Sequence, residues 1–107
     1  PGNDVESTTA MAGAGANLII FSTGLGTPTG NPVTPVIKIS SNTTIAQNLS
    51  DIIDFDTGSI IAGEASLDTL ANDLFQLVID TASGHYQTCA QRLSQDDFIP
   101  WKRGVSL

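Results

Sequence analysis

The chain has 107 residues, a length typical of one domain, and its 40% hydrophobic content is sufficient for a packed core. A formal charge of −7 disfavours binding to nucleic acid or to anionic membrane surfaces, and no apolar run approaches the roughly 20 residues of a membrane span. Charged residues make up only 14% of the chain, so we expect part of its polar surface to be covered by something else.

The chain begins with the pattern of a helix followed by a strand. Residues 3–16 favour a short helix, because Asn3 and Glu6 have the spacing of a capping box. Residues 17–23 form a nearly continuous apolar run of strand length. Such a run predicts a strand that is covered on both faces, as in a parallel sheet.

A second strand is predicted at residues 36–42, after a loop rich in Gly and Pro. Its alternation places the isoleucines on one face and Lys38 on the other. Residues 43–50 favour a short helix or turn, which Thr43 would cap.

The clearest helical pattern covers residues 66–83, and Gly84 is placed to end this helix in a left-handed conformation. Apolar residues recur at helical spacing along one face, and we expect this stripe to belong to the core: Leu67, Leu70, Ala71, Leu74, Leu77, Val78 and Ala82. The alternation of helices and strands indicates a small layered α/β domain, with a mainly parallel sheet flanked by helices, similar to half of a Rossmann-like fold.

The Gly-rich loop at residues 24–32 is the most distinctive local feature. In parallel α/β sheets ligands gather at the carboxyl ends of the strands, and this loop directly follows a predicted strand. If the two strands are neighbours, their ends form one edge of a polar pocket with these candidate ligand-binding residues: Thr23, Gly24, Gly26, Thr27 and Asn42. The loop matches neither the dinucleotide-binding pattern nor a phosphate-binding loop, and it would equally serve to turn the chain or to pack on a neighbouring domain.

Three charged side chains are candidates for catalysis. A lysine at a sheet end, such as Lys38, is suited to hold a carboxylate or a developing oxyanion, although it would also fit an exposed position. Asp54 and Asp56 share a face if the chain is extended there, which suits acid–base chemistry or a hard metal ion. The alternative for Asp56 is turn chemistry, because Asp-Thr-Gly is a common turn sequence.

Cysteine and histidine provide no cluster with the spacing of a metal site. Cys89 has no Cys or His partner nearby in sequence, so an inert thiol is expected, and His85 fits the end of the preceding helix. One cysteine cannot form an internal disulfide, which favours a reducing, cytoplasmic setting. The chain opens with Pro1 rather than Met, and we expect residues 1–107 to be one domain of a longer protein.

Four segments, in order, resemble the C-terminal region of the altronate and galactarate dehydratase family. They are PGNDVEST (1–8), TGLGTPTGNPVTPVIKISSN (23–42), IDFDTG (53–58) and LVIDTASG (77–84). The closing WKRGVSL (101–107) is more similar to the altronate branch. Members of the family often carry Arg at the position of Leu25. The loop of this chain lacks that cation, which makes Lys38 a more important candidate for holding a substrate carboxylate.

The resemblance implies the C-terminal domain of a cytoplasmic hydro-lyase that converts D-altronate to 2-keto-3-deoxy-D-gluconate and water. It implies iron(II) or another divalent metal in the full-length enzyme, with no metal ligand identified in residues 1–107. The implied partners are the sugar acid, N-terminal and middle domains of the same chain, and further copies in a homo-oligomer. A galactarate dehydratase domain, or a structural module with catalysis in the other domains, remains open.

Overall fold

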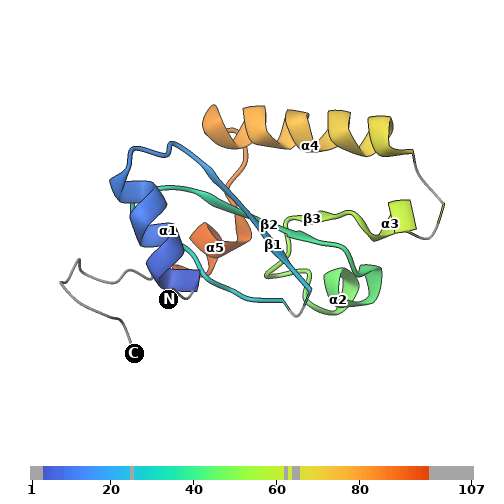
Figure 1. The fold of residues 1–107 in the computed structure, drawn as a ribbon, viewed down its shortest axis with the longest axis horizontal. Helices are drawn as coiled ribbons and strands as arrows, with labels where there is room; N and C mark the ends of the chain where they lie inside the picture. The colour runs from blue at the N-terminus through green and yellow to red at the C-terminus, as the bar shows by residue number, and fades with distance from the viewer. Residues whose placement is uncertain (1–3, 25, 62, 64–65, 97–107) are drawn as a thin grey trace.

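The computed structural model describes residues 4–24, 26–61, 63 and 66–96. Their centre is a three-stranded parallel sheet in the order β1-β2-β3, formed by β1 (Ile19–Thr23), β2 (Val36–Ser40) and β3 (Phe55–Asp56). Five helices accompany it in the described part, as Figure 1 shows: α1 (Asp4–Gly13), α2 (Thr43–Asn48), α3 (Gly58–Ile61), α4 (Leu67–Ala82) and α5 (Cys89–Arg92). The predicted small α/β domain with a parallel sheet is therefore confirmed.

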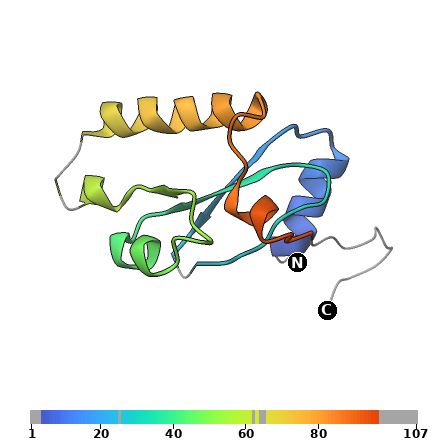
Figure 2. The ribbon, with the colours of Figure 1, turned by 180° about the vertical axis from the view of Figure 1, so that it is seen from behind.

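The two faces of the sheet have different coverings. Lys38 bonds to the loop that joins β1 to β2, and this loop, α2 and α5 lie on the side of the sheet opposite α4 (Figures 1 and 2). On this loop-side face the central strand is closed, since Val36, Lys38 and Ser40 are all buried. The loop-side face of the central strand is therefore covered along its whole length.

The other face, which α4 overlies, is only partly covered. Ile37 in the central strand is fully buried, but Ile20 on the neighbouring strand β1 is 47% exposed. The residues of β1 alternate between buried and open positions. The prediction that β1 would be covered on both faces is wrong for the described chain, because α4 does not close over this edge strand.

The helix ends follow local hydrogen-bonding rules. The N-cap of α2 is Asn42 rather than the expected Thr43, because the Asn42 side chain accepts a hydrogen bond from the backbone N–H of Ile45. Ser66 caps α4 in the same way, and Gly84 after its end has a φ of +80°, as expected. In the described part of the chain, no helix is long and apolar enough to cross a membrane.

Candidate functional site

The carboxyl ends of the three strands meet at one edge of the sheet. The register pairs Thr23 with Ser40 and Ser40 with Asp56, so these three residues form a single row across the sheet. Neighbouring strands lie about 4.8 Å apart, which brings the row within the reach of one small polar ligand. The expectation that the ends of β1 and β2 adjoin is confirmed, and β3, which the sequence pattern did not predict, adds Asp56. We call this row and the turns that follow it the carboxyl edge.

The hydroxyl of Thr23 folds the first of these turns. Its Oγ1 accepts hydrogen bonds from the backbone N–H groups of Gly26 at 3.0 Å and Thr27 at 3.2 Å, and it lies 3.3 Å from the Thr27 hydroxyl. Gly26 has a φ of +86°, and a Cβ there would lie 2.3 Å from the end of the Leu49 side chain. Gly24 is exposed beside this turn, whereas Leu25 lies outside the described residues.

The turns after β2 and β3 are also bonded within themselves. Ser40 Oγ donates to the carbonyl of Asn42 and accepts from its N–H, both at 3.1 Å. Asp56 Oδ1 accepts from the N–H of Gly58 at 2.7 Å and from the Thr43 hydroxyl at 3.4 Å. The edge is thus a set of preformed turns. Asn42 is exposed on it, and within the described part of the chain its amide nitrogen makes no hydrogen bond.

Lys38 lies beneath this edge rather than at it. Its side chain is fully buried, so the alternative of an exposed lysine is wrong. The ammonium donates a hydrogen bond to the carbonyl of Thr29 and lies 5.7 Å from the centre of the Phe21 ring. In this arrangement the only cation before Arg92 holds the backbone of the Gly-rich loop against the sheet.

Asp54 is bonded on both carboxylate oxygens to groups inside the domain. Oδ2 accepts from the backbone N–H of Lys38 at 2.7 Å. Oδ1 accepts from the Tyr86 hydroxyl at 2.6 Å and from the N–H of Cys89 at 2.8 Å. Asp54 and Asp56 therefore have separate sets of partners, and Asp54 links the sheet to the chain that enters α5.

This cluster contains two groups that hold their protons strongly. Burial, together with the hydrogen bond to the Asp54 carboxylate, raises the pKa of Tyr86. Burial, and then the charge of Asp54, raises the pKa of the Cys89 thiol, whose Sγ lies 3.7 Å from the carbonyls of Ser50 and Ile53. A protonated, buried thiol is a poor nucleophile, which agrees with the inert role expected for Cys89.

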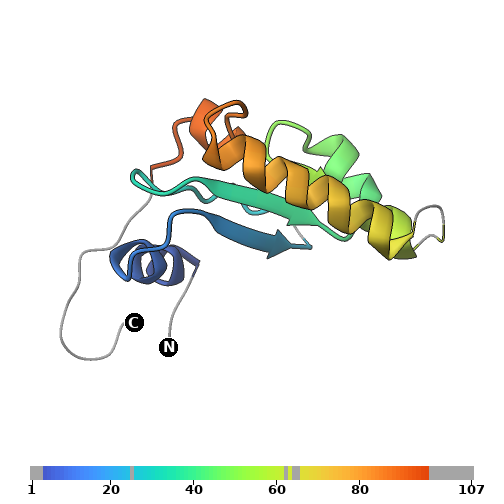
Figure 3. The same ribbon diagram turned by 90° about the horizontal axis from the view of Figure 1, so that it is seen from above.

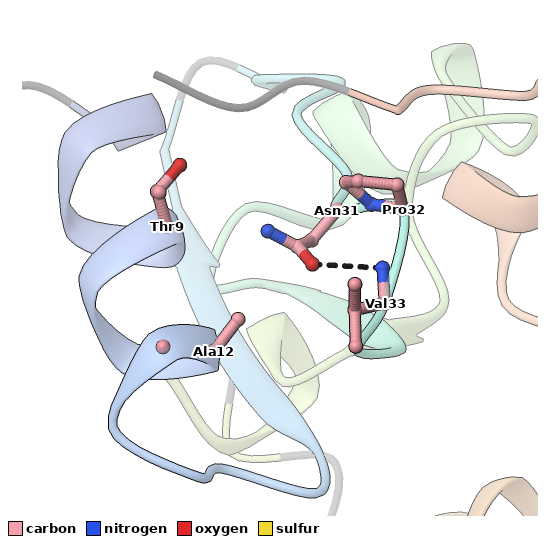
Figure 4. Close-up of a pocket in the computed structure, with 6 residues that line it drawn as sticks. Thr9, Ala12, Asn31, Pro32 and Val33 are labelled. Carbon is pink, nitrogen blue, oxygen red and sulfur yellow. Dashed lines mark hydrogen bonds between the residues drawn. The ribbon is translucent and has the colours of Figure 1, made fainter. Parts of the chain in front are cut away.

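A cavity of about 360 Å³ lies between α1 and the loop that enters β2, as Figure 4 shows. Its walls are mainly apolar and come from the end of α1 and from the loop that enters β2: Thr9, Ala12, Gly13, Asn31, Pro32 and Val33. Asn31 Oδ1 is bonded to the N–H groups of Val33 at 2.9 Å and Thr34 at 3.1 Å. Such a lining suits an apolar group rather than a polyhydroxy acid.

The described residues do not fit an iron(II) centre. Among them, no three side chains of the His, Cys, Asp and Glu types come together as a set of metal ligands. Of the candidates, Cys89 is buried and bonded to backbone carbonyls, and both oxygens of Asp54 are used by the chain itself. The side chains and turns of the described residues are suited to binding and positioning a ligand, and Asp56 at the carboxyl edge is a carboxylate that can take part in proton transfer.

Comparison with known proteins identifies the family. The sequence model for the C-terminal domain of D-galactarate/altronate dehydratase matches residues 1–106. The chain belongs to this family. The chain is 40% identical to altronate dehydratase of Escherichia coli K12 over 107 residues, which is 100% of the chain and 21% of that protein.

Two further relatives carry related names. Galactarate dehydratase (L-threo-forming) of Escherichia coli K12 is 34% identical over 88 residues, 82% of the chain and 17% of the relative. Altronate dehydratase of Bacillus subtilis 168 is 33% identical over 84 residues, 78% of the chain and 17% of the relative. The chain thus spans about a fifth of the length of the curated relatives it matches.

Some features of the site had no signal in the sequence. Tyr86 and the N–H of Cys89 reach Asp54 from more than thirty residues away, and nothing in their local pattern indicates this contact. The tail residues Trp101, Lys102 and Arg103, for which docking on the body or on another domain was open, lie outside the described residues.

Proposed function

We propose that the chain is the C-terminal domain of a sugar-acid hydro-lyase, which most closely fits the conversion of D-altronate to 2-keto-3-deoxy-D-gluconate and water. The observation that carries the proposal is the family match over residues 1–106, together with 40% identity to an altronate dehydratase over the whole chain. The parallel sheet supports it, because its carboxyl edge is where ligands bind in folds of this kind.

The carboxyl edge would bind the sugar acid through polar groups. Asn42 is exposed there and offers an amide donor to a carboxylate or hydroxyl, and Thr27 and Asp56 flank it on the neighbouring turns. Thr23, Gly24 and Gly26 would shape the turn that contacts the ligand. Asp56 is the candidate carboxylate for proton transfer, because it belongs to the edge row.

Lys38 and Asp54 would act from inside the domain. Lys38 fixes the Gly-rich loop through the carbonyl of Thr29, and Asp54 fixes the central strand through the N–H of Lys38. We propose that both residues position the edge. Direct contact of Lys38 with substrate would require the loop to move away from its buried ammonium.

Removal of the proton beside a carboxylate produces an enediolate, which a divalent metal stabilises when it is present. In the proposed enzyme iron(II) or another divalent ion would be held by residues outside the described part, since the described residues do not form such a site. We extend the proposal to a cytoplasmic homo-oligomer whose remaining domains lie in the four fifths of the relatives' length that the chain does not match.

The test uses the full-length protein that contains this domain. We expect it to release a 2-oxo acid from D-altronate faster than from galactarate in the presence of iron(II), measured anaerobically. Turnover of neither acid would contradict the dehydratase proposal, and faster turnover of galactarate would reassign the substrate within the family.

The site assignment is tested in the same protein by Lys38→Met and Asp56→Asn, with Ser7→Ala on the exposed side of α1 as the matched control. We expect both site variants to lose activity while the control keeps it. Wild-type rates in both site variants would show that the carboxyl edge takes no part in the reaction.

A structural module is the second candidate function. The observation in its favour is that several side chains of the edge already bond within the domain. If Asn42→Ala, Lys38→Met and Asp56→Asn changed the assembly state of the full-length protein without changing its KM, this candidate would replace the first.

A further inference from the structure

One row of apolar side chains on α4 is not covered by the described chain. Leu67, Ala71, Phe75 and Ile79 follow each other at intervals of four residues, so they form a ridge along the helix. All four are exposed, with exposed fractions of 68% for Leu67, 65% for Phe75 and 41% for Ile79. The expectation that the apolar stripe of this helix belongs to the core is therefore wrong for Leu67 and Ala71, while Phe75 and Ile79 were not part of that predicted stripe.

The next ridge of α4 is the one that turns toward the sheet. Leu70, Leu74 and Val78 are partly covered, and Thr81 near the end of the helix is buried. Figure 3 shows α4 running back over the sheet, with its end near the start of the strands. The apolar arc of α4 is thus wider than the surface beneath it, and its outer ridge is not covered by the described residues.

A further exposed apolar side chain lies on the sheet face that α4 overlies. Ile20 pairs with Ile37 of β2, so the two side chains lie on the same face of the sheet, which is the face that α4 overlies. The next residue of β1, Phe21, lies on the opposite face, where its ring contacts Lys38. Ile20 is 47% exposed on the outer strand. We call these five residues, namely Leu67, Ala71, Phe75, Ile79 and Ile20, the α4 ridge patch. A set of several large exposed apolar side chains, unlike a single exposed leucine, marks a surface that another element covers.

We infer that the α4 ridge patch is the docking surface for another region of the same longer chain. This inference rests on the proposed function in one respect only, because both require a chain that extends beyond residues 1–107. The matched relatives have about four fifths of their length outside the aligned region, so a covalently attached occupant of ample size is available. Because the side chains of the patch are apolar, we expect the occupant to present an apolar face of a helix or sheet that brings no charged side chain into the contact.

The size of the patch favours an attached occupant over a second copy. A stable interface between separate proteins engages roughly 20–30 residues on each side. The patch offers five apolar residues. A tether raises the effective concentration of the occupant to about the millimolar range, so a small apolar contact suffices within one chain.

The occupant is identified by photo-crosslinking in the full-length protein. Phe75 is replaced by p-benzoylphenylalanine, which keeps an aromatic side chain at the centre of the ridge. The matched control carries the same replacement at Asp73, which is exposed on a different side of α4. An equal mixture of isotopically light and heavy chains is irradiated, and the joined peptides are sequenced by mass spectrometry.

We expect position 75 to join to a peptide outside residues 1–107 in the same chain, with several-fold more product than position 73. Joining between light and heavy chains, whether within residues 1–107 or beyond them, would overturn the inference in favour of a partner subunit. Product from position 75 no greater than from position 73 would overturn it as well.

Activity separates this inference from the proposed function. The crosslinking result is read from peptide masses and needs no substrate, whereas the dehydratase proposal is read from release of the 2-oxo acid. A same-chain crosslink in a protein without turnover would keep the inference and reject the proposed function. A second pair of variants, Phe75→Ser and Asp73→Ser, tests the same point by hydrogen exchange, with faster exchange of α4 expected only for Phe75→Ser.

Discussion

The carboxylate of Asp54 accepts a hydrogen bond from the backbone N–H of Lys38 over 2.7 Å. The same carboxylate bonds to Tyr86 and to the N–H of Cys89, so one side chain joins the central strand to the segment between α4 and α5. Asp54 is therefore a structural centre of the domain, and its replacement has consequences that can be separated from catalysis.

Asp54→Asn is expected to destabilise the domain. The amide would point an N–H₂ group at donors that now face a carboxylate oxygen, and a hydrogen bond to a charged group contributes about 1.5–3 kcal/mol. Urea denaturation measures the loss. Asp51→Asn is the matched control, because Asp51 is exposed close by in sequence. Equal stability of the two variants would show that the Asp54 contacts are energetically neutral.

Stability is expected to fall at alkaline pH because of Tyr86 and Cys89. The pKa values of both groups are raised in the folded state, so the folded protein keeps two protons that the unfolded chain releases. Their contribution is fully present below the unfolded pKa values, about 8.5 for Cys and 10 for Tyr, and is lost as the pH rises above them toward the folded values.

The limiting slope is about 1.4 kcal/mol per pH unit for each proton retained. The chain has one Tyr and one Cys, so Tyr86→Phe and Cys89→Ala isolate the two contributions. We expect each variant to flatten the decline in the unfolding free energy measured between neutral and alkaline pH. An unchanged slope in the double variant would assign the decline to other groups.

Gly30→Ala and Gly13→Ala are expected to change stability in opposite directions. A Cβ on Gly30 would lie 2.1 Å from the backbone carbonyl oxygen of Gln95, and overpacking of this kind costs about 1–3 kcal/mol. A Cβ on Gly13, in α1, would meet nothing within 4 Å, and the change stabilises a helix by about 0.5–1 kcal/mol. Thermal unfolding of the two variants checks both signs.

Asn42 combines a cap with a proposed ligand contact, and two substitutions separate these roles. Asn42→Asp keeps the oxygen that caps α2 but replaces the exposed amide with a negative charge, so we expect stability to be retained and the KM for a sugar acid to rise. Asn42→Ala is expected to cost about 1 kcal/mol of stability. A KM that is unchanged in Asn42→Asp would place the ligand elsewhere.

The elements with a clear local signal were predictable, and those without one were not. The 16-residue helix α4 and the strand β2 follow from repeated apolar spacing, and β1 follows from a nearly continuous apolar run. The strand β3 has two residues and α5 has four, which is too short for a period to be read, and both exist because they pack on β2.

For the site, the meeting of Thr23 with the end of β2 followed from parallel pairing. The burial of Lys38 did not, because it depends on where the carbonyl of Thr29 lies after a loop without regular structure. The partners of Asp54 were equally beyond local pattern. Its carboxylate is bonded by residues 32 and 35 positions later in the chain, whose approach is a property of the whole fold.

Because Asp54 is bonded to Tyr86, the segment that contains α3 and α4 resembles an insertion in the chain. The chain leaves the sheet after β3 and returns to Asp54 at Tyr86, so everything between is an excursion whose two ends are held together. Each doubling in the length of such a closed loop costs only about 0.6 kcal/mol in entropy. A change in the length of this excursion is therefore expected to leave the strands in place.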